Sequence, residues 1–216
     1  MTLHLYLSVP VAGFRVAHAR EYWETYRCPP PSTVYGMLLS LVGEPDRLMH
    51  CGAELAIALV DEVVPSRVLR SLWRVKALAV EPGLGQNKRP DFQEVLTGMR
   101  LSVWLRPGAR EPARPTLAER VAAGLKDPSG IVRFGGLSLG ESTQLVDEVR
   151  PWRPQDPRRG WSLLTDAAGD LSLPVWPDHV GSAGSRFAQY RLCSGPLDAE
   201  PDPEAWSAIL PPGTAA

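Results

Sequence analysis

Residues 82–90, PGLGQNKRP, carry side chains that suit contact with a nucleic acid better than packing in a core. Gln86 and Asn87 have amides that donate and accept hydrogen bonds, and Lys88 and Arg89 have cations that bind phosphates. The glycines let the backbone turn sharply between the two prolines. We therefore expect a polar loop that is mobile in the isolated protein and ordered when it binds an anionic partner. The candidate contacts here are Arg74, Lys76, Gln86, Asn87, Lys88 and Arg89.

Charge is unevenly distributed along the 216-residue chain, whose formal net charge is −1. Residues 67–114 hold ten Lys/Arg against four Asp/Glu, whereas residues 1–66 hold four against seven and residues 115–216 hold nine against thirteen. The net charge alone argues against a nucleic-acid protein. A basic middle between acidic flanks nevertheless predicts one face that meets an anionic ligand.

The segment AHAREYWETYR, residues 17–27, is the strongest candidate for hydrolytic chemistry, because Glu21 and Glu24 lie near His18. No matched carboxylates, HExxH, CxxC or GxSxG spacing occurs elsewhere, so a solvated loop is the preferred interpretation and we expect no metal and no cofactor. General acid–base cleavage of RNA needs only a few placed side chains, so spacing leaves it open. Tyr and Arg side chains on this loop can stack on bases. They are Arg20, Tyr22, Tyr26 and Arg27.

The glycine-rich segment RFGGLSLGES, residues 133–142, is neither a Walker A loop nor a GxGxxG dinucleotide fingerprint. Its glycines can simply permit a tight turn. They can also expose backbone to a phosphate chain, with Ser138 and Ser142 beside it. Gly135, Gly136 and Ser138 are the candidate contacts, and both interpretations stay open.

The periodicity of apolar residues predicts the strands and helices that would position these candidate side chains. Strict alternation predicts strands at 3–9 and 95–106, and further strands are expected at 54–63, 67–76 and 143–149. Helical spacing predicts helices over 29–43, with Ser32 as its cap and Gly43 at its end, and over 116–125, with a Thr116/Glu119 capping box. This order gives an α+β, ferredoxin-like βαββαβ domain over residues 1–150, with a basic hairpin inserted in its middle.

Residues 151–216 change in composition, with RPWRPQDPRRGW followed by the short strand LSLPVW. We expect a small irregular β appendage that ends in a mobile tail. Three separated cysteines, no signal peptide and no apolar run of membrane-spanning length predict a cytoplasmic protein without a membrane segment.

The segment CPPPSTVYGMLLSLVGE resembles the first-helix motif of the fifth numbered family of Cas proteins, a subunit of type I CRISPR Cascade complexes. RFGGLSLGES resembles the glycine-rich loop of the same RAMP superfamily, and the GQNKR insertion stands where the family carries its thumb. The sequence YGMLLSLVGE is most similar to that of the DevS branch of type I-B systems. The resemblance covers about residues 1–150.

The resemblance implies a non-catalytic subunit that binds the 5′ handle of CRISPR RNA, caps the backbone filament and holds the large subunit that recognises the protospacer-adjacent motif (PAM) on target DNA. By position, the thumb would span about residues 78–94. The handle pocket would use the first loop and helix together with the glycine-rich loop. Its members would be Arg20, Tyr26, Arg27, Ser32, Tyr35, Gly135, Gly136 and Ser138.

Type I-C relatives cut precursor RNA with a tyrosine, a lysine and a histidine. This chain has Tyr35 but no Lys-His pair after the thumb. The alternatives to an RNA-binding scaffold are therefore a metal-independent endoribonuclease of the same fold and a protein-interaction module that binds no nucleic acid.

Overall fold

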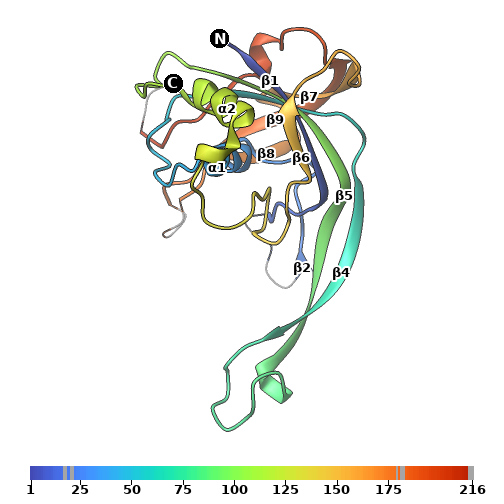
Figure 1. Cartoon of the computed structure of the whole chain (residues 1–216). Helices are drawn as coiled ribbons and strands as arrows, with labels where there is room; N and C mark the ends of the chain where they lie inside the picture. The colour runs from blue at the N-terminus through green and yellow to red at the C-terminus, as the bar shows by residue number, and fades with distance from the viewer. Residues whose placement is uncertain (17–18, 20–21, 179, 181–182, 214–216) are drawn as a thin grey trace.

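One mainly antiparallel sheet and two helices build the α+β fold of the computed structural model (Figure 1). The structure describes residues 1–216 except 17–18, 20–21, 179, 181–182 and 214–216. The helices are α1 (Pro31–Leu41) and α2 (Leu117–Lys126). The strands are β1 (Leu3–Ala12), β2 (Tyr22–Trp23), β3 (Glu54–Leu59), β4 (Val64–Trp73), β5 (Lys88–Arg106), β6 (Glu148–Pro151), β7 (Arg159–Thr165), β8 (Leu171–Trp176), β9 (Arg186–Pro196) and β10 (Ser207–Ala208).

The strand order along the described sheet is β6-β1-β5-β3-β7-β9-β8. β1 pairs antiparallel with β5 from Leu3↔Leu105 to Ala12↔Leu96, and with β6 on its other edge. β5 also pairs antiparallel with β3. α1 connects the β1 side of the sheet to β3, and α2 connects β5 to β6.

The core lies between the helices and one face of this sheet. Alternation places Leu5 and Leu7 of β1 and Leu101 of β5 on that face, where each is fully buried. Leu38 of α1 and Leu117 of α2 are buried against them. The two strands expected from alternation are therefore confirmed, because every second residue along them faces an apolar layer.

The other face of the sheet is covered by the C-terminal part of the chain. Trp104 of β5 and the small residues Ala56 and Ala58 of β3 form a second buried cluster with Leu197 and Ala205. The prediction of an irregular appendage for residues 151–216 is wrong, because β7 pairs with β3 and continues the sheet through β9 to β8.

The prediction of a mobile C-terminal tail is also wrong for the described residues up to 213. β10 pairs with β3, and Ile209 is fully buried in the main core. The expected strand over 143–149 is wrong up to residue 147: residues 141–144 form a turn, and β6 begins only at Glu148.

The two helix starts differ from each other. The Thr116/Glu119 capping box of α2 is confirmed, with both reciprocal hydrogen bonds present. Ser32 does not cap α1, because Pro30 occupies the cap position and the Ser32 hydroxyl instead donates to the Pro174 carbonyl oxygen of β8 at 2.7 Å. Gly43 follows α1 with φ +66°, the left-handed conformation expected there.

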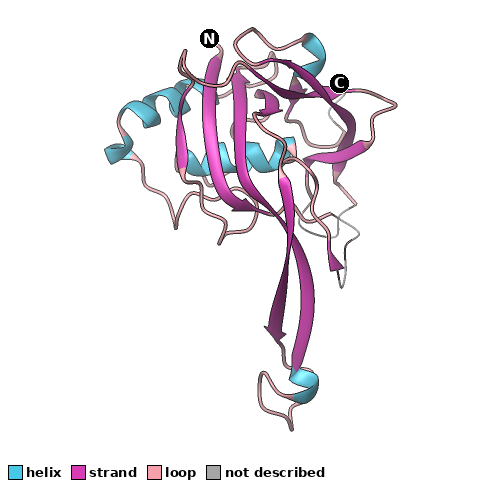
Figure 2. Cartoon of the chain, turned by 90° about the vertical axis from the view of Figure 1, so that its right-hand side faces the viewer, coloured by secondary structure: helices cyan, strands magenta, loops and turns pink. Residues whose placement is uncertain are grey.

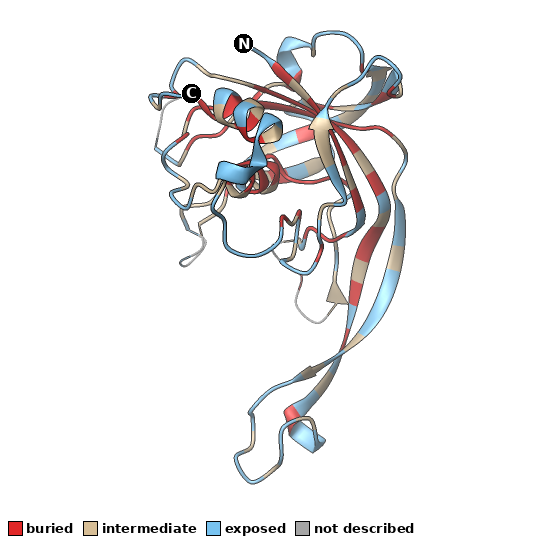
Figure 3. Ribbon diagram, viewed as in Figure 1, coloured by how far each residue is buried: buried red, intermediate tan, exposed pale blue. Residues whose placement is uncertain are grey.

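A long hairpin projects from the body of the molecule. β4 and β5 pair from Val64↔Thr97 to Trp73↔Lys88, and residues 74–87 form the tip. Figure 2 shows the two strands twisting around each other as they leave the sheet. β5 becomes less buried toward the tip, whereas β4 is exposed or half-buried along its whole length (Figure 3). We call residues 64–97 the hairpin.

Candidate nucleic-acid interface

The hairpin tip holds a group of exposed cations. Arg74, Lys76 and Lys88 are exposed, whereas Arg89 is half-buried and its Nε lies 2.7 Å from Oδ1 of Asp91. Gln86 is exposed as well, and its backbone carbonyl accepts from Arg74 Nε at 3.2 Å. The sequence prediction thus groups five side chains that the structure also places together, at the end of the hairpin.

Asn87 differs from the other candidates at the tip. Its side chain is fully buried, and its Oδ1 accepts from the backbone N–H groups of Lys76 at 2.7 Å and Ala77 at 2.9 Å. Its Nδ2 donates to the carbonyl oxygens of Ala77 and Val80. The expectation that Asn87 contacts RNA is wrong, because all of its hydrogen-bonding capacity is used to close the tip. These bonds also argue against a tip that orders only when RNA is present.

Trp73 is the last residue of β4 before the tip. Its side chain is 72% exposed, so it is no core residue, and Gly83 lies against its ring. A Cβ atom on Gly83 would come within 2.7 Å of the ring, and Gly83 has φ +82°. Only glycine fits this position without strain.

The middle of the paired strands of the hairpin is tied to the glycine-rich loop, residues 133–142. Arg70 Nη1 donates to Gln93 Oε1 and lies 3.1 Å from Glu141 Oε2, and Gln93 Nε2 donates to Glu141 Oε1 at 2.6 Å. Gln144 Oε1 accepts from the backbone N–H groups of Gly13 and Glu141 at 2.7 and 2.8 Å. Sequence reasoning missed this junction, because its members lie on four separate segments.

The glycine-rich loop is exposed at its start. Gly135 has φ +75° and open space around its Cα, and the preceding Phe134 is fully exposed. Ser138 is half-buried and forms an isolated antiparallel bridge with Leu145. Gly136 packs against the Leu145 side chain, so that a Cβ there would come within 2.9 Å of it.

The first loop reaches the hairpin through β2. β2 pairs in parallel with β5 at Phe92 and Gln93, and the Tyr22 hydroxyl donates to Glu94 Oε1 at 2.7 Å. Trp23 has the guanidinium of Arg15 4.5 Å and that of Arg70 5.5 Å from its ring centroid.

The three loop residues predicted to contact RNA have different positions. Arg27 is exposed and lines a cavity of about 660 Å³ with Glu94 and Trp161. Tyr26 is half-buried against the core. Arg20, together with His18 and Glu21, lies outside the described residues.

Tyr35 is a core residue and not a member of a handle pocket. Its side chain is 3% exposed, and its hydroxyl donates to the Arg47 carbonyl oxygen at 2.8 Å. Burial raises the pKa of this hydroxyl, with the nearby Cys51 thiol as the next cause. Ser32 is likewise used in packing, through its bond to Pro174. The prediction that Tyr35 contacts RNA is therefore wrong, whereas that for the half-buried Ser32 stays a prediction.

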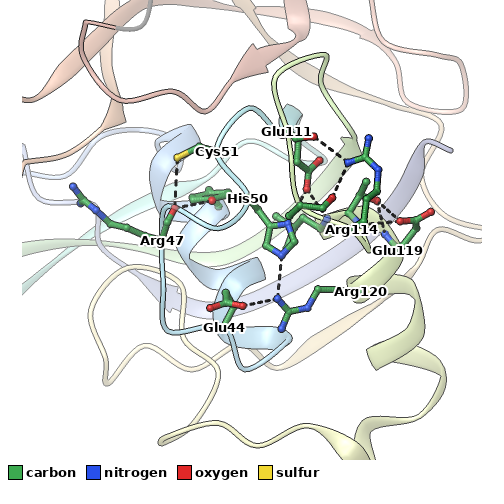
Figure 4. A network of polar contacts seen from close by, with 12 residues as sticks. Glu44, Arg47, His50, Cys51, Glu111, Arg114, Glu119 and Arg120 are labelled. Atoms are coloured by element: carbon green, nitrogen blue, oxygen red, sulfur yellow. Dashed lines mark hydrogen bonds and ion pairs between the residues drawn. The ribbon is translucent and has the colours of Figure 1, made fainter.

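A buried polar network lies beside Tyr35 and connects α1 to α2 (Figure 4). His50 is 1% exposed, and its Nδ1 lies 2.8 Å from Glu111 Oε1, which also accepts from the Leu117 N–H at 2.7 Å. Arg120 Nη1 donates to His50 Nε2 at 3.0 Å and to Glu44 Oε2 at 2.6 Å. Because a guanidinium can only donate, Nε2 accepts from Arg120, and Nδ1 then carries the proton donated to Glu111.

His50 and Glu111 at the centre of this network are buried, whereas Arg120 and Glu44 are half-buried at its edge. The arrangement suits a structural role. Glu111 Oε2 is buried without a hydrogen-bond partner among the described atoms. Among the described residues, no group of three or more His, Cys, Asp and Glu side chains could hold a metal ion. Neither described helix is long and apolar enough to cross a membrane.

The structure therefore brings only some of the predicted residues together, in two separate places. The cations and Gln86 lie at the tip of the hairpin (Figure 1), and the glycine-rich loop contacts the middle of its paired strands. Arg70, Gln93 and Glu141 connect the loop to the hairpin.

Comparison with known proteins identifies the family. No family model matches the chain. The chain is 43% identical over 189 residues to the CRISPR-associated protein Cas5 of Myxococcus xanthus (strain DK1622), and the match covers 87% of this chain and 88% of the relative. Its fold is similar to that of a chain from a solved CRISPR RNA-guided surveillance complex, with a TM-score of 0.61 at 14% identity over 98% of this chain and 92% of that chain. The identity over most of both sequences agrees with the motif of the first helix, and this chain belongs to the Cas5 family of CRISPR-associated proteins.

Proposed function

We propose that this protein is an RNA-binding, non-catalytic subunit of a type I-B Cascade complex in the cytoplasm. It holds the 5′ handle of the CRISPR RNA, caps the backbone filament and supports the large subunit that recognises the PAM on target DNA. Membership of the Cas5 family and the fold similarity to a chain of an RNA-guided surveillance complex support the proposal.

The strand order supports a ferredoxin-like core for residues 1–150. β1, α1, β3, β5, α2 and β6 follow one another in the βαββαβ succession, once β2 and β4 are counted as insertions. In this interpretation the hairpin is the family's thumb, inserted in the chain between β3 and the part of β5 that pairs with β3. Residues 151–216 then form the second part of the chain, which extends the sheet from β3.

The observation that carries the RNA-binding function is the projecting hairpin with its exposed cations. The tip of the hairpin projects from the body with Arg74, Lys76 and Lys88 exposed. These side chains therefore add little to the stability of the fold. Phosphate groups of RNA would neutralise these charges and release counterions. Several such contacts would make the affinity strongly dependent on salt, which a protein-interaction module without nucleic acid would not show.

A metal-independent endoribonuclease remains the alternative function. Tyr35 and His50 are 3% and 1% exposed, so neither described side chain can meet an RNA strand without opening the core. His4 is stacked between two tryptophans and bonded to Ser102. We therefore favour the scaffold. Cleavage of a labelled CRISPR repeat RNA by the purified protein in EDTA would identify the enzyme instead.

The test is co-purification of the tagged chain from cells that hold a CRISPR array and the neighbouring subunits, followed by sequencing of the bound RNA. We expect guide RNAs with one uniform 5′ end. The variant Arg74→Ala/Lys76→Ala/Lys88→Ala should lose most of this RNA. The matched control is Lys126→Ala/Arg153→Ala/Arg159→Ala, which removes the same charge from exposed positions outside the hairpin. Random RNA, or none, in the wild-type preparation would contradict the proposed function.

A further inference from the structure

The outer side of β4 carries no further strand among the described residues. In that part of the chain β4 pairs with β5 alone, from Val64↔Thr97 to Trp73↔Lys88. It is the outer of the two strands where the hairpin leaves the body (Figure 1). We call the side of residues 65–73 that faces away from β5 the hairpin edge.

The register shows which backbone groups the hairpin edge presents. The Arg74 N–H donates to the Asn87 carbonyl oxygen at 3.0 Å, and every second pair of an antiparallel ladder is bonded in this way. The even-numbered residues of β4 therefore bond to β5, and the odd-numbered residues point their N–H and C=O groups outward. Pro65 and the pair Ser71↔Pro90 fit this assignment, because a proline has no N–H for a bonded pair. The outward N–H groups are those of Arg67, Leu69, Ser71 and Trp73.

The hairpin edge is long, exposed and partly apolar. Leu69 and Trp73 are 61% and 72% exposed. Their side chains lie on the same face of the hairpin as that of Arg67, which is 73% exposed. Proteins commonly protect a free edge with a short strand, a lysine or a bulge. β4 has ten residues and no lysine, and its register with β5 is unbroken. An edge of this kind can pair with a strand of another chain.

We propose that the hairpin edge binds an extended, acidic segment of a neighbouring protein subunit, which adds one strand to β4. The backbone of this segment accepts from the outward N–H groups and donates to the outward carbonyl oxygens. One of its carboxylates lies beside Arg67, and its apolar side chains cover Leu69 and Trp73. The inference rests on the proposed function, in which this chain is one subunit of an assembly. It adds the surface that holds a protein partner and the chemistry of the partner segment.

Charge favours an acidic segment over a second copy of this chain. Residues 64–73 contain two arginines, Arg67 and Arg70, and no Asp or Glu. Arg67 Nε lies 3.9 Å from Glu94 Oε1, a long contact that leaves the guanidinium capacity for another carboxylate. Two copies of β4 side by side would bring four arginines together and contribute no carboxylate of their own. Like charges on paired strands destabilise a sheet.

RNA does not match the hairpin edge, although the exposed cations of the tip suit it. The edge presents N–H donors and carbonyl acceptors in turn, whereas a phosphate group offers only acceptors. The outward carbonyl oxygens would face its negative charge, which is unfavourable. An extended peptide matches both kinds of backbone group.

Hydrogen exchange at single-residue resolution tests the pairing in three samples: the isolated chain, the chain with guide RNA, and the complete assembly. In the isolated chain, the N–H groups of Val68 and Arg70 should exchange slowly and those of Leu69 and Ser71 rapidly, because only the first two bond to β5. In the assembly, exchange of the Leu69 and Ser71 N–H groups should slow by about tenfold or more, as for a hydrogen bond formed on assembly.

The three samples also separate the possible occupants. Unchanged exchange of Leu69 and Ser71 in the assembly would overturn the inference. Protection by guide RNA alone would overturn it in favour of RNA, and protection in the isolated chain that rises with its concentration would overturn it in favour of a second copy. The RNA content of the assembly is measured in parallel. Protected outward groups in an assembly without guide RNA would contradict the proposed function and leave the hairpin edge as a protein contact.

A proline at the hairpin edge supplies the matched pair of variants. Ser71→Pro removes one outward N–H and leaves the bonds between β4 and β5 in place, as Pro65 does at a position of the same kind. Ser71→Ala keeps the N–H and is the control. One neighbouring protein subunit should leave the tagged Ser71→Pro chain about fivefold faster or more than it leaves the Ser71→Ala chain. The affinity of the isolated chain for guide RNA should be the same in both. Equal rates of subunit loss would overturn the inference.

The charge of the partner segment is tested at Arg67. Arg67→Glu should speed the loss of the same subunit, because it places a carboxylate beside the acidic segment. Arg153→Glu makes an equal change of charge at an exposed position outside the hairpin and should not affect this rate. Equal effects of the two substitutions would overturn the acidic character of the segment.

Discussion

Asn87 and Ala77 are joined by two hydrogen bonds across the tip of the hairpin, although ten residues separate them. Asn87 Oδ1 accepts from the Ala77 N–H at 2.9 Å, and its Nδ2 donates to the Ala77 carbonyl oxygen at 2.9 Å. The Asn87 side chain thus forms the same pair of hydrogen bonds with Ala77 that the backbone of a neighbouring strand would form. The exposed cations on either side of it, Lys76 and Lys88, owe their relative positions to this one buried amide.

Replacing Asn87 by alanine should open the tip and leave the body folded. The change leaves the Lys76 and Ala77 N–H groups and two carbonyl oxygens without partners, at a local cost of about 1–3 kcal/mol. Hydrogen exchange of residues 74–87 should accelerate about tenfold or more, because 1.4 kcal/mol corresponds to a factor of ten. The melting temperature should hardly change, since the tip lies outside the core.

The control is Gln86→Ala, which removes an exposed neighbouring amide and keeps the backbone carbonyl that binds Arg74. Equal exchange rates in the two variants would show that the Asn87 side chain does not organise the tip.

Tyr35→Phe should destabilise the fold without affecting RNA binding. The substitution removes only the hydroxyl that donates to the Arg47 carbonyl oxygen, and a typical bond of this kind contributes about 1 kcal/mol to the free energy of unfolding. Urea denaturation measures this loss, and the RNA content of the assembly should equal that of the wild type. A large loss of RNA at unchanged stability would show that Tyr35 contacts RNA as a member of the handle pocket.

The sequence predicts those features of the fold that depend on near neighbours. The Thr116/Glu119 capping box needs only three residues of separation, and the alternation of β1 and β5 needs only a buried face on one side. The hairpin follows from the two strands that flank a polar turn. These signals are local, so the distant parts of the chain do not change them.

The roles of single side chains could not be predicted, because distant contacts decide them. Tyr35 and Asn87 have the right chemistry for RNA, yet each is buried by residues that the sequence does not place beside it. The same holds for the Arg70–Gln93–Glu141 junction, whose members come from β4, β5 and the glycine-rich loop. The pairing of β7 with β3 joins residues about 100 positions apart, and no local pattern signals it.

Two substitutions at Glu111 should differ in their consequences for stability. Glu111→Ala leaves the His50 Nδ1–H and the Leu117 N–H unpaired in the core, at about 1–3 kcal/mol for each group. Glu111→Gln keeps the accepting oxygen for both and removes a buried negative charge whose Oε2 has no partner among the described atoms. It should therefore be close to neutral. Denaturant midpoints of the two variants measure the difference, and similar midpoints would show that the bonds in Figure 4 contribute little.

The salt dependence of RNA affinity should report the number of hairpin cations that meet phosphates. Each cation in contact contributes a slope of about 0.7–0.9 in the logarithm of affinity against the logarithm of salt concentration. Lys88→Ala should lower the slope by about this amount, because Lys88 is exposed. Arg89→Ala should have a smaller effect on the slope, because Arg89 already has Asp91 as its ion-pair partner. Equal changes from both substitutions would show that RNA displaces Asp91.

His4 should make the stability of the protein depend on pH in a defined window. Its ring is stacked between Trp104 and Trp152 with centroids 4.3 and 4.4 Å away, and its Nε2 lies 2.7 Å from Ser102 Oγ. Desolvation by this burial lowers the His4 pKa from 6.5 to about 4, against the opposing charge of Asp156. Between these two values the unfolded chain binds a proton that the folded chain does not. The stabilising contribution of neutral His4 is therefore complete above pH 6.5 and is lost as the pH falls toward 4.

His4→Phe keeps an aromatic ring in the stack and removes the titrating group. Between pH 5 and 6.5, its free energy of unfolding should depend on pH less steeply than that of the wild type, by up to about one proton. Denaturant titrations at several pH values measure both slopes. The carboxylates of the chain titrate in both proteins, so their contribution cancels in the comparison. Identical slopes would mean that His4 takes up its proton without leaving the stack between the two tryptophans.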